Sequence, residues 1–296
     1  MNGIPLRGIL LLVLGLSAAA FSGGLMKIMA ETMPPTLIVW FRFLGYFLMM
    51  VPVVMWRTRQ TGVRVFPVPR PRMQFLRGLV MAGSTICFIT GARTLPYADA
   101  IAILYAYPFF LTLAAPWILG EKVSLAAWAG VAGGFVGVLI IMRPSFEGVG
   151  TDALWVLLCA ILVTTQLVLN RKLGAIADPL VTSCYGACIA MLATSLAVPW
   201  LWQPVPVEDW AILALLAATG AISQTTIVMA FSNAEASDLA PFTYSEIVAA
   251  VVFGFLMFGT LPDWISWIGI ALIITSGVMV ARAMAMRNTP RRVPKI

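Results

Sequence analysis

The feature that most constrains this chain is a series of ten apolar runs, each close to the roughly 20 residues that a helix needs to cross a bilayer core. The runs do not alternate apolar and polar residues, as the strands of a membrane barrel would. The breaks between them carry proline, glycine or charge, as at Pro34-Pro35 and Pro262-Asp263. We therefore expect an all-α membrane protein of ten transmembrane helices, at 7–30, 34–56, 73–93, 97–119, 124–142, 152–170, 179–202, 209–231, 237–259 and 264–285.

The scarcity of charged residues indicates that lipid is the main solvent around this protein. Only 10% of the residues are charged and 61% are apolar, whereas a soluble domain carries roughly 25% charged residues. The first 26 residues resemble a signal peptide, but similar apolar runs continue to the end of the chain. We therefore expect an uncleaved first span and a multi-pass protein of the cytoplasmic (inner) membrane.

The basic residues predict the orientation. With the N-terminus in the cytoplasm, fifteen of the 19 lysines and arginines fall on the inner side. Lys27, Arg93 and Arg143 fall near the outer face, and Arg42 lies within a span. This bias follows the positive-inside rule and predicts that both termini are cytoplasmic. The net charge of +7 is explained by orientation, so we expect no nucleic-acid partner.

An internal repeat divides the chain into two halves. A shift of 139 residues aligns identical residues, namely Asp99 with Asp238, Tyr105 with Tyr244, Gly120 with Gly259, Trp128 with Trp267, Gly130 with Gly269, Ala132 with Ala271, and Arg143 with Arg282. Because five spans is an odd number, a second five-helix unit must enter the membrane the other way up, a plan typical of secondary transporters. We expect repeats at 1–145 and 151–286, followed by a basic cytoplasmic tail at 287–296.

Glu246, near the middle of the ninth run, is the sharpest candidate for a functional residue. A carboxylate at that depth costs several kcal/mol and is expected to face an interior or a wet cavity. Its repeat mate is Tyr107, beside Tyr105, and we expect these positions to line one central cavity. The structural alternative is a glutamic acid that is protonated or paired with a neighbouring helix.

Other polar and aromatic residues within the runs are further candidates. Arg42 either contacts an anionic substrate group or backbone carbonyls, or it only snorkels or locks two helices together, and we favour the structural interpretation. Pro108 should kink the fourth span and could act in gating. The remaining candidate substrate-binding residues are Tyr244, Gln166, Asn170, Gln224 and Ser84.

Several kinds of site are not expected. The chain has no histidine, and its four cysteines lie inside apolar runs, so we predict no metal site, cofactor or disulfide framework. There is no phosphate-binding loop of the G-x-x-x-x-G-K-[ST] type, which argues against an ATP-driven pump. Without histidine or a clustered acid pair, an enzyme is disfavoured. Small residues recur every fourth position in the fifth span, and we assign them to packing within the half or to a homodimer: Ala126, Gly130 and Gly134, and Ala129, Gly133 and Gly137.

Taken together, the sequence resembles the drug/metabolite transporter superfamily, specifically its EamA-type members. The residues that carry the resemblance are Gly120-Glu121-Lys122-Val123-Ser124, Trp128-Ala129-Gly130, Gly137 and Arg143-Pro144. The second half departs from the pattern, because Thr260 follows Gly259 where a glutamate is common. The resemblance implies a central cavity lined mainly by spans 1, 3, 4, 6, 8 and 9, and alternating access with gates at the ends of spans 3–4 and 8–9.

The resemblance also implies the class of function. We expect a secondary transporter that exports small metabolites, most simply amino acids. The alternative is an uptake carrier for riboflavin, S-adenosylmethionine or a similar planar metabolite. A channel is disfavoured, because a single chain built from two halves fits a carrier better.

Overall fold

The computed structural model describes residues 6–62, 68–114, 116, 118, 125–142, 150–174, 178–233 and 239–288. Its elements are α1 (Leu6–Met29), α2 (Pro35–Thr61), α3 (Pro71–Ala92), α4 (Tyr97–Leu104), α5 (Tyr107–Ala114), α6 (Leu125–Met142), α7 (Thr151–Gly174), α8 (Pro179–Ser195), α9 (Val198–Leu201), α10 (Asp209–Asn233), the 3₁₀ helix η2 (Ala240–Tyr244), α12 (Ser245–Phe258) and α13 (Trp264–Asn288). The all-helical prediction is confirmed for these residues. The family motif at 120–124 and tail residues 289–296 lie outside them.

Within the described residues, six helices are long and apolar enough to cross a membrane. They are Leu6–Met29, Pro35–Gln60, Pro71–Ala92, Tyr97–Ala114, Thr151–Asn170 and Asp209–Phe231. Four shorter apolar helices lie within the other predicted runs, at Trp128–Met142, Leu180–Ser195, Phe242–Phe258 and Trp264–Val280. Ten crossings and their up-and-down order therefore stay a prediction.

The outer surface of the helices is apolar. Large side chains such as Leu10, Leu48, Phe75 and Phe255 are exposed on α1, α2, α3 and α12. Contiguous apolar surface of this kind is unfavourable in water. Hydrocarbon solvates it without cost, which is consistent with a membrane-embedded protein.

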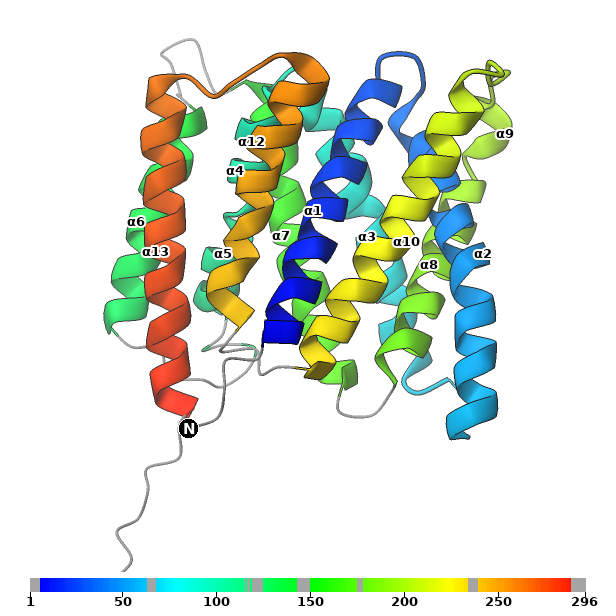
Figure 1. Ribbon diagram of the computed structural model, residues 1–296, viewed down its shortest axis with the longest axis horizontal. Coiled ribbons are helices and arrows are strands. Elements are labelled where there is room, and N and C mark those ends of the chain that lie inside the picture. The colour runs from blue at the N-terminus through cyan, green and yellow to red at the C-terminus, as the bar shows by residue number, and fades with distance from the viewer. Residues whose placement is uncertain are drawn as a thin grey trace, which may run out of the picture.

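The main helix contacts join the two halves of the chain. α1 packs on α10 and α12, α2 on α8 and α10, α3 on α7 and α8, and α6 on α13. Figure 1 shows α6 beside α13 at one end of the row of helices and α2 beside α8 at the other. The halves therefore do not form separate bodies, and the centre of the molecule is an interface between them.

The glycine ridge of α6, formed by Gly130, Gly133, Gly134 and Gly137, packs mainly on α13. A Cβ added at Gly137 would lie 2.9 Å from Gly269 O, and one at Gly130 would lie 2.6 Å from the Val280 side chain. Gly134 instead leaves room for the ring of Phe109 in its own half. The sequence interpretation expected packing within the half or a homodimer. Apart from Gly134, the ridge contacts the other half of the same chain.

The fourth predicted span is broken in the middle. α4 ends at Leu104 and α5 begins at Tyr107, because Pro108 cannot donate a backbone hydrogen bond and its ring clashes with the carbonyl four residues earlier. The ninth span changes geometry at a related point, where the 3₁₀ helix η2 ends at Tyr244 and α12 begins. Tyr105 and Tyr244 are the residues that the 139-residue shift aligns.

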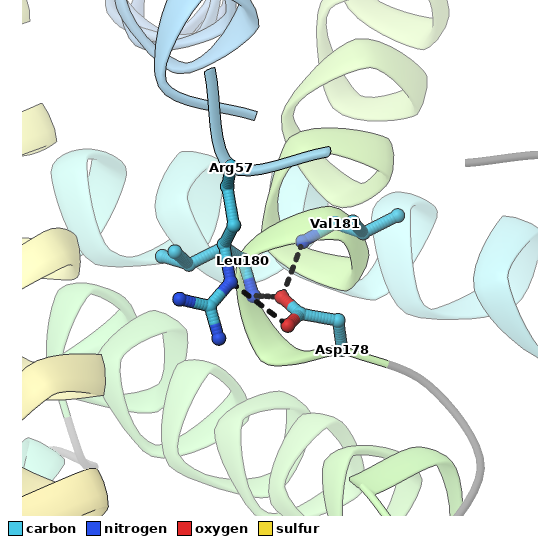
Figure 2. A network of polar contacts seen from close by, with 4 residues as sticks. All are labelled: Arg57, Asp178, Leu180 and Val181. Atoms are coloured by element: carbon cyan, nitrogen blue, oxygen red, sulfur yellow. Dashed lines mark hydrogen bonds and ion pairs between the residues drawn. The ribbon is translucent and has the colours of Figure 1, made fainter. Parts of the chain in front are cut away.

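An ion pair ties the end of α2 to the start of α8 (Figure 2). Arg57 Nε lies 3.0 Å from Asp178 Oδ2. The other oxygen of Asp178 accepts from the backbone N–H groups of Leu180 at 2.9 Å and Val181 at 3.3 Å. Asp178 therefore acts as the N-cap of α8 and satisfies donors that would otherwise be unpaired at the helix start.

Replacing Gly137 by alanine tests the contact between the halves. Because the new methyl group would meet the backbone of α13, we expect Gly137→Ala to lower the free energy of unfolding by about 1–3 kcal/mol. Gly83→Ala is the matched control, since its Cβ would lie 3.6 Å from Leu162 Cδ1, an ordinary contact. Thermal unfolding in detergent, followed by circular dichroism, should distinguish the two, and equal melting temperatures would contradict the packing.

Candidate functional site

A cavity of about 250 Å³ lies between the two halves. Its walls come from α1, α2, α3, α4, α7, α10 and α12. These helices include the spans that the family resemblance implies, and α2 is an addition. The polar and charged side chains that line the cavity are Arg42, Tyr46, Ser84, Thr85, Gln166, Ser223, Gln224 and Glu246.

Glu246 lies in the first turn of α12, directly after η2. Its Oε2 accepts a hydrogen bond of 2.8 Å from the hydroxyl of Tyr105. The same hydroxyl lies 2.6 Å from Thr243 O, so one O–H group serves two acceptors. Tyr105, at the break of the fourth span, thus orients the carboxyl group of Glu246 in the ninth span.

The predicted tyrosines form a layer behind Glu246. The Tyr105 ring lies 5.4 Å from those of both Tyr107 and Tyr244. Tyr105 is fully buried, and none of these three described residues belongs to the cavity wall. Tyr244 also requires Gly277, because a Cβ there would collide with the tyrosine hydroxyl. The sequence proposed these tyrosines as substrate-binding residues, and the geometry places them as supports of the wall.

Arg42 enters the cavity from α2. Its Nη1 donates to Met26 Sδ at 2.9 Å, which holds the guanidinium against α1. The structure shows no ion pair between Arg42 and Glu246, or between either of them and another described residue. The cavity therefore contains a guanidinium and a carboxyl group that do not form an ion pair with each other.

The other candidates separate into two groups. Gln166 on α7, Gln224 on α10 and Ser84 on α3 line the cavity, although the Ser84 hydroxyl already donates to Met81 O at 3.0 Å. Asn170 lies outside the wall, where its Oδ1 accepts from Arg77 Nε. Pro108 sits at the start of α5 and its carbonyl accepts from Thr112 at 2.8 Å, so it shapes the break without lining the cavity.

Two residues that the sequence interpretation did not select are prominent in the structure. Arg77, one of the fifteen basic residues expected on the inner side of the membrane, is buried and donates to Thr182 O at 2.9 Å as well as to Asn170. Tyr46 lines the cavity, one helical turn after Arg42. The spacing of four residues could have identified Tyr46, because residues i and i+4 share one helix face.

Among the described residues, no group of three or more cysteine, aspartate and glutamate side chains is placed to hold a metal ion. Cys159 lines the cavity, and all four cysteines are free thiols.

Comparison with known proteins connects this architecture to transport. The profile of the EamA-like transporter family matches residues 6–143 and 151–282. The chain is 30% identical to a riboflavin transporter from Rhizobium johnstonii, over 80% of this chain and 77% of that protein. It is 24% identical to an S-adenosylmethionine uptake transporter from Rickettsia prowazekii, over 93% and 92% of the two chains. It is 27% identical to the pseudopaline exporter CntI from Pseudomonas aeruginosa, over 93% and 96%.

A solved crystal structure supports the same fold. It superposes with a TM-score of 0.64 and 20% sequence identity, over 96% of each chain. The relatives named above are transporters and not enzymes, which is consistent with the expectation from the sequence. With the profile matching both halves and the relatives aligned over most of their length, we conclude that this multi-pass membrane protein belongs to the EamA-like transporter family.

Proposed function

We propose that the protein is a secondary transporter that exports amino acids, or metabolites with an amino-acid head group, across the inner membrane. The observation that supports this proposal is the pair of opposite charges in one small cavity. Arg42 and Glu246 both line it and do not pair with each other. A substrate that carries both a carboxylate and an ammonium group complements the two side chains.

The energetics favour such a substrate over a neutral one. An ionised side chain inside a membrane protein costs several kcal/mol unless it is paired or solvated. A zwitterion supplies a partner for each charge, so the desolvation of Arg42 and Glu246 on binding is offset by two charge-assisted hydrogen bonds. A neutral planar molecule would displace solvent from both side chains and would give neither of them a partner of opposite charge.

The size of the cavity favours a small substrate. Pockets for drug-sized ligands measure roughly 300–1,000 Å³, whereas this cavity measures about 250 Å³. The alternative substrates that the family resemblance implies, riboflavin and S-adenosylmethionine, are also the substrates for which two relatives are named. S-adenosylmethionine has an amino-acid head group and satisfies the charge argument, but it needs more room. Riboflavin has neither a carboxylate nor an ammonium group.

We further propose that the ten helical segments form two inverted five-helix repeats with both termini in the cytoplasm. The inter-half contacts of α1, α3 and α6 and the paired breaks near Tyr105 and Tyr244 support this arrangement. Rocking of one half against the other would open the cavity to each side in turn. The breaks in the fourth and ninth spans are then the natural hinges, because they interrupt the helices that carry Tyr105 and Glu246.

Transport by purified protein in liposomes tests the substrate class. We expect labelled L-phenylalanine and L-methionine to be transported, and an excess of unlabelled amino acid on the opposite side to accelerate exchange. L-phenylalaninamide, which lacks the carboxylate, and phenethylamine should compete poorly because Arg42 would lose its partner. Transport of riboflavin without transport of any zwitterion would contradict the proposal and favour the alternative.

Replacing Glu246 by glutamine tests the anionic half of the site. We expect Glu246→Gln to reduce amino-acid transport at least about tenfold, which corresponds to roughly 1.4 kcal/mol of lost interaction with the ammonium group. Folding should be preserved, because the amide oxygen can still accept from Tyr105. Glu208→Gln is the matched control, since Glu208 is exposed before α10. If both variants transport like the parent protein, Glu246 has no part in the binding site.

A further inference from the structure

A second hollow, which we call the α2–α8 groove, lies between α2 and α8. It has a volume of about 280 Å³ and shares no lining residue with the central cavity. The side chains that line it are spaced by three and four residues, so each helix contributes one continuous face. Those used below are Phe47, Val51, Val54 and Met55 on α2, and Val181 and Cys188 on α8. The groove opens to the surroundings of the protein, because Met55 is 51% exposed.

The α2–α8 groove is long and narrow. On α2 it runs from Phe47 to Met55, which is about 12 Å of helix. Over that length its volume corresponds to a mean cross-section of about 23 Å². A helix with its side chains is roughly 10–12 Å across and is too wide for this space. A hydrocarbon chain, whose carbon atoms contact their neighbours at roughly 4 Å, fits along it.

The length of the groove matches the depth of one leaflet. The hydrocarbon core of a bilayer is about 30 Å thick, so one leaflet accounts for about 15 Å. Trp56, directly after the groove residue Met55, is 61% exposed, and exposed tryptophans are enriched at the level of the lipid head groups. A groove of about 12 Å that begins next to Trp56 ends close to the middle of the membrane, where an acyl chain also ends.

Basic residues follow the groove at this head-group end. Arg57 comes three residues after Val54 and Arg59 comes four residues after Met55, so both continue the groove face of α2. Asp178, at the start of α8, is occupied by Arg57 and by the first N–H groups of its own helix (Figure 2). Arg59 is exposed and forms no ion pair with another residue in the part of the chain that the structure describes. One positive charge therefore remains beside the Arg57–Asp178 pair.

We infer that the α2–α8 groove binds one acyl chain of an anionic phospholipid of the phosphatidylglycerol class, whose phosphate meets Arg59. A guanidinium forms strong charge-assisted hydrogen bonds with phosphate, and basic pockets between transmembrane helices recognise anionic head groups. Phosphatidylglycerol has one net negative charge, which complements Arg59, whereas phosphatidylcholine carries its own cation. The site is separate from the central cavity and does not depend on the substrate proposed for it. Because α2 and α8 come from different halves of the sequence, the bound lipid bridges the two halves.

Photocrosslinking with lipid probes tests the site in the full-length protein. The protein would be reconstituted in liposomes of phosphatidylcholine and phosphatidylglycerol in equal amounts, with a trace of either lipid carrying a diazirine within one acyl chain. After illumination, mass spectrometry of peptides would locate the adducts. We expect the phosphatidylglycerol probe to label residues 47–55 and 181–188 several-fold more than the phosphatidylcholine probe. The exposed apolar face of α12, around Val248 and Phe255, should be labelled equally by the two probes. Equal labelling of the groove by both probes would overturn the inference.

Two substitutions separate the head-group contact from the acyl-chain contact. Arg59→Gln should lower the ratio of phosphatidylglycerol to phosphatidylcholine labelling in the groove about fivefold, the effect of about one arginine near an anionic lipid surface. Arg7→Gln is its matched control, because Arg7 is exposed at the start of α1 and away from the groove. Val51→Phe should reduce groove labelling by both probes, because the larger ring occupies the space of the chain. Val248→Phe, on the exposed face of α12, should leave groove labelling unchanged.

The variants also define the results that would contradict the site. If Arg59→Gln keeps the labelling ratio of Arg7→Gln, the head group is not recognised there and the inference is wrong. If Val51→Phe is labelled in the groove as strongly as Val248→Phe, the acyl chain lies elsewhere and the inference is also wrong. A second copy of the chain is the competing occupant. Oxidation that joins Cys188 of two copies in the same liposomes, with no lipid adduct in the groove, would identify that copy and overturn lipid binding.

Discussion

The low capacity of lipid to solvate charge and hydrogen-bonding groups is the constraint on which this structure depends. Each polar group within the helices has to find a partner inside the protein or in the substrate. Most hydroxyls are satisfied by carbonyls of their own helix, as for Thr164 and Thr194. Arg42 and Glu246 both line the cavity without pairing with each other, and their arrangement is the main support for the proposed zwitterionic substrate.

The cavity exists because the two halves interlock at their closest helices. α1 packs on α10 and α12, and α3 on α7, so each wall combines helices from both halves. Close approach depends on glycines such as Gly137, which meets the backbone of α13. A movement of one half against the other would change the shape of the cavity directly. This coupling between packing and site is what an alternating-access mechanism requires.

Membership of the family establishes transport, whereas the choice of cargo depends on a few side chains. Relatives of similar identity are named for riboflavin, S-adenosylmethionine and pseudopaline, so the fold accommodates different substrates. Fold and function are separable in this way because specificity comes from the groups that line the site. The charged groups that line the cavity of this chain are the Arg42 guanidinium and the Glu246 carboxyl group.

The sequence alone determined the helical class, the lipid environment and the family, because long apolar runs fit few structures other than helices that cross a membrane. It also identified Glu246 and Arg42, since an ionised residue within such a run is conspicuous, and it anticipated the break near Pro108. Only the tertiary structure decided which faces meet: it placed Gln166 and Gln224 on the cavity, Asn170 beside Arg77, and the tyrosines behind the wall. Helical periodicity assigns a residue to a face but does not specify the neighbour of that face, so only the packing of the helices decides which residues meet at the cavity.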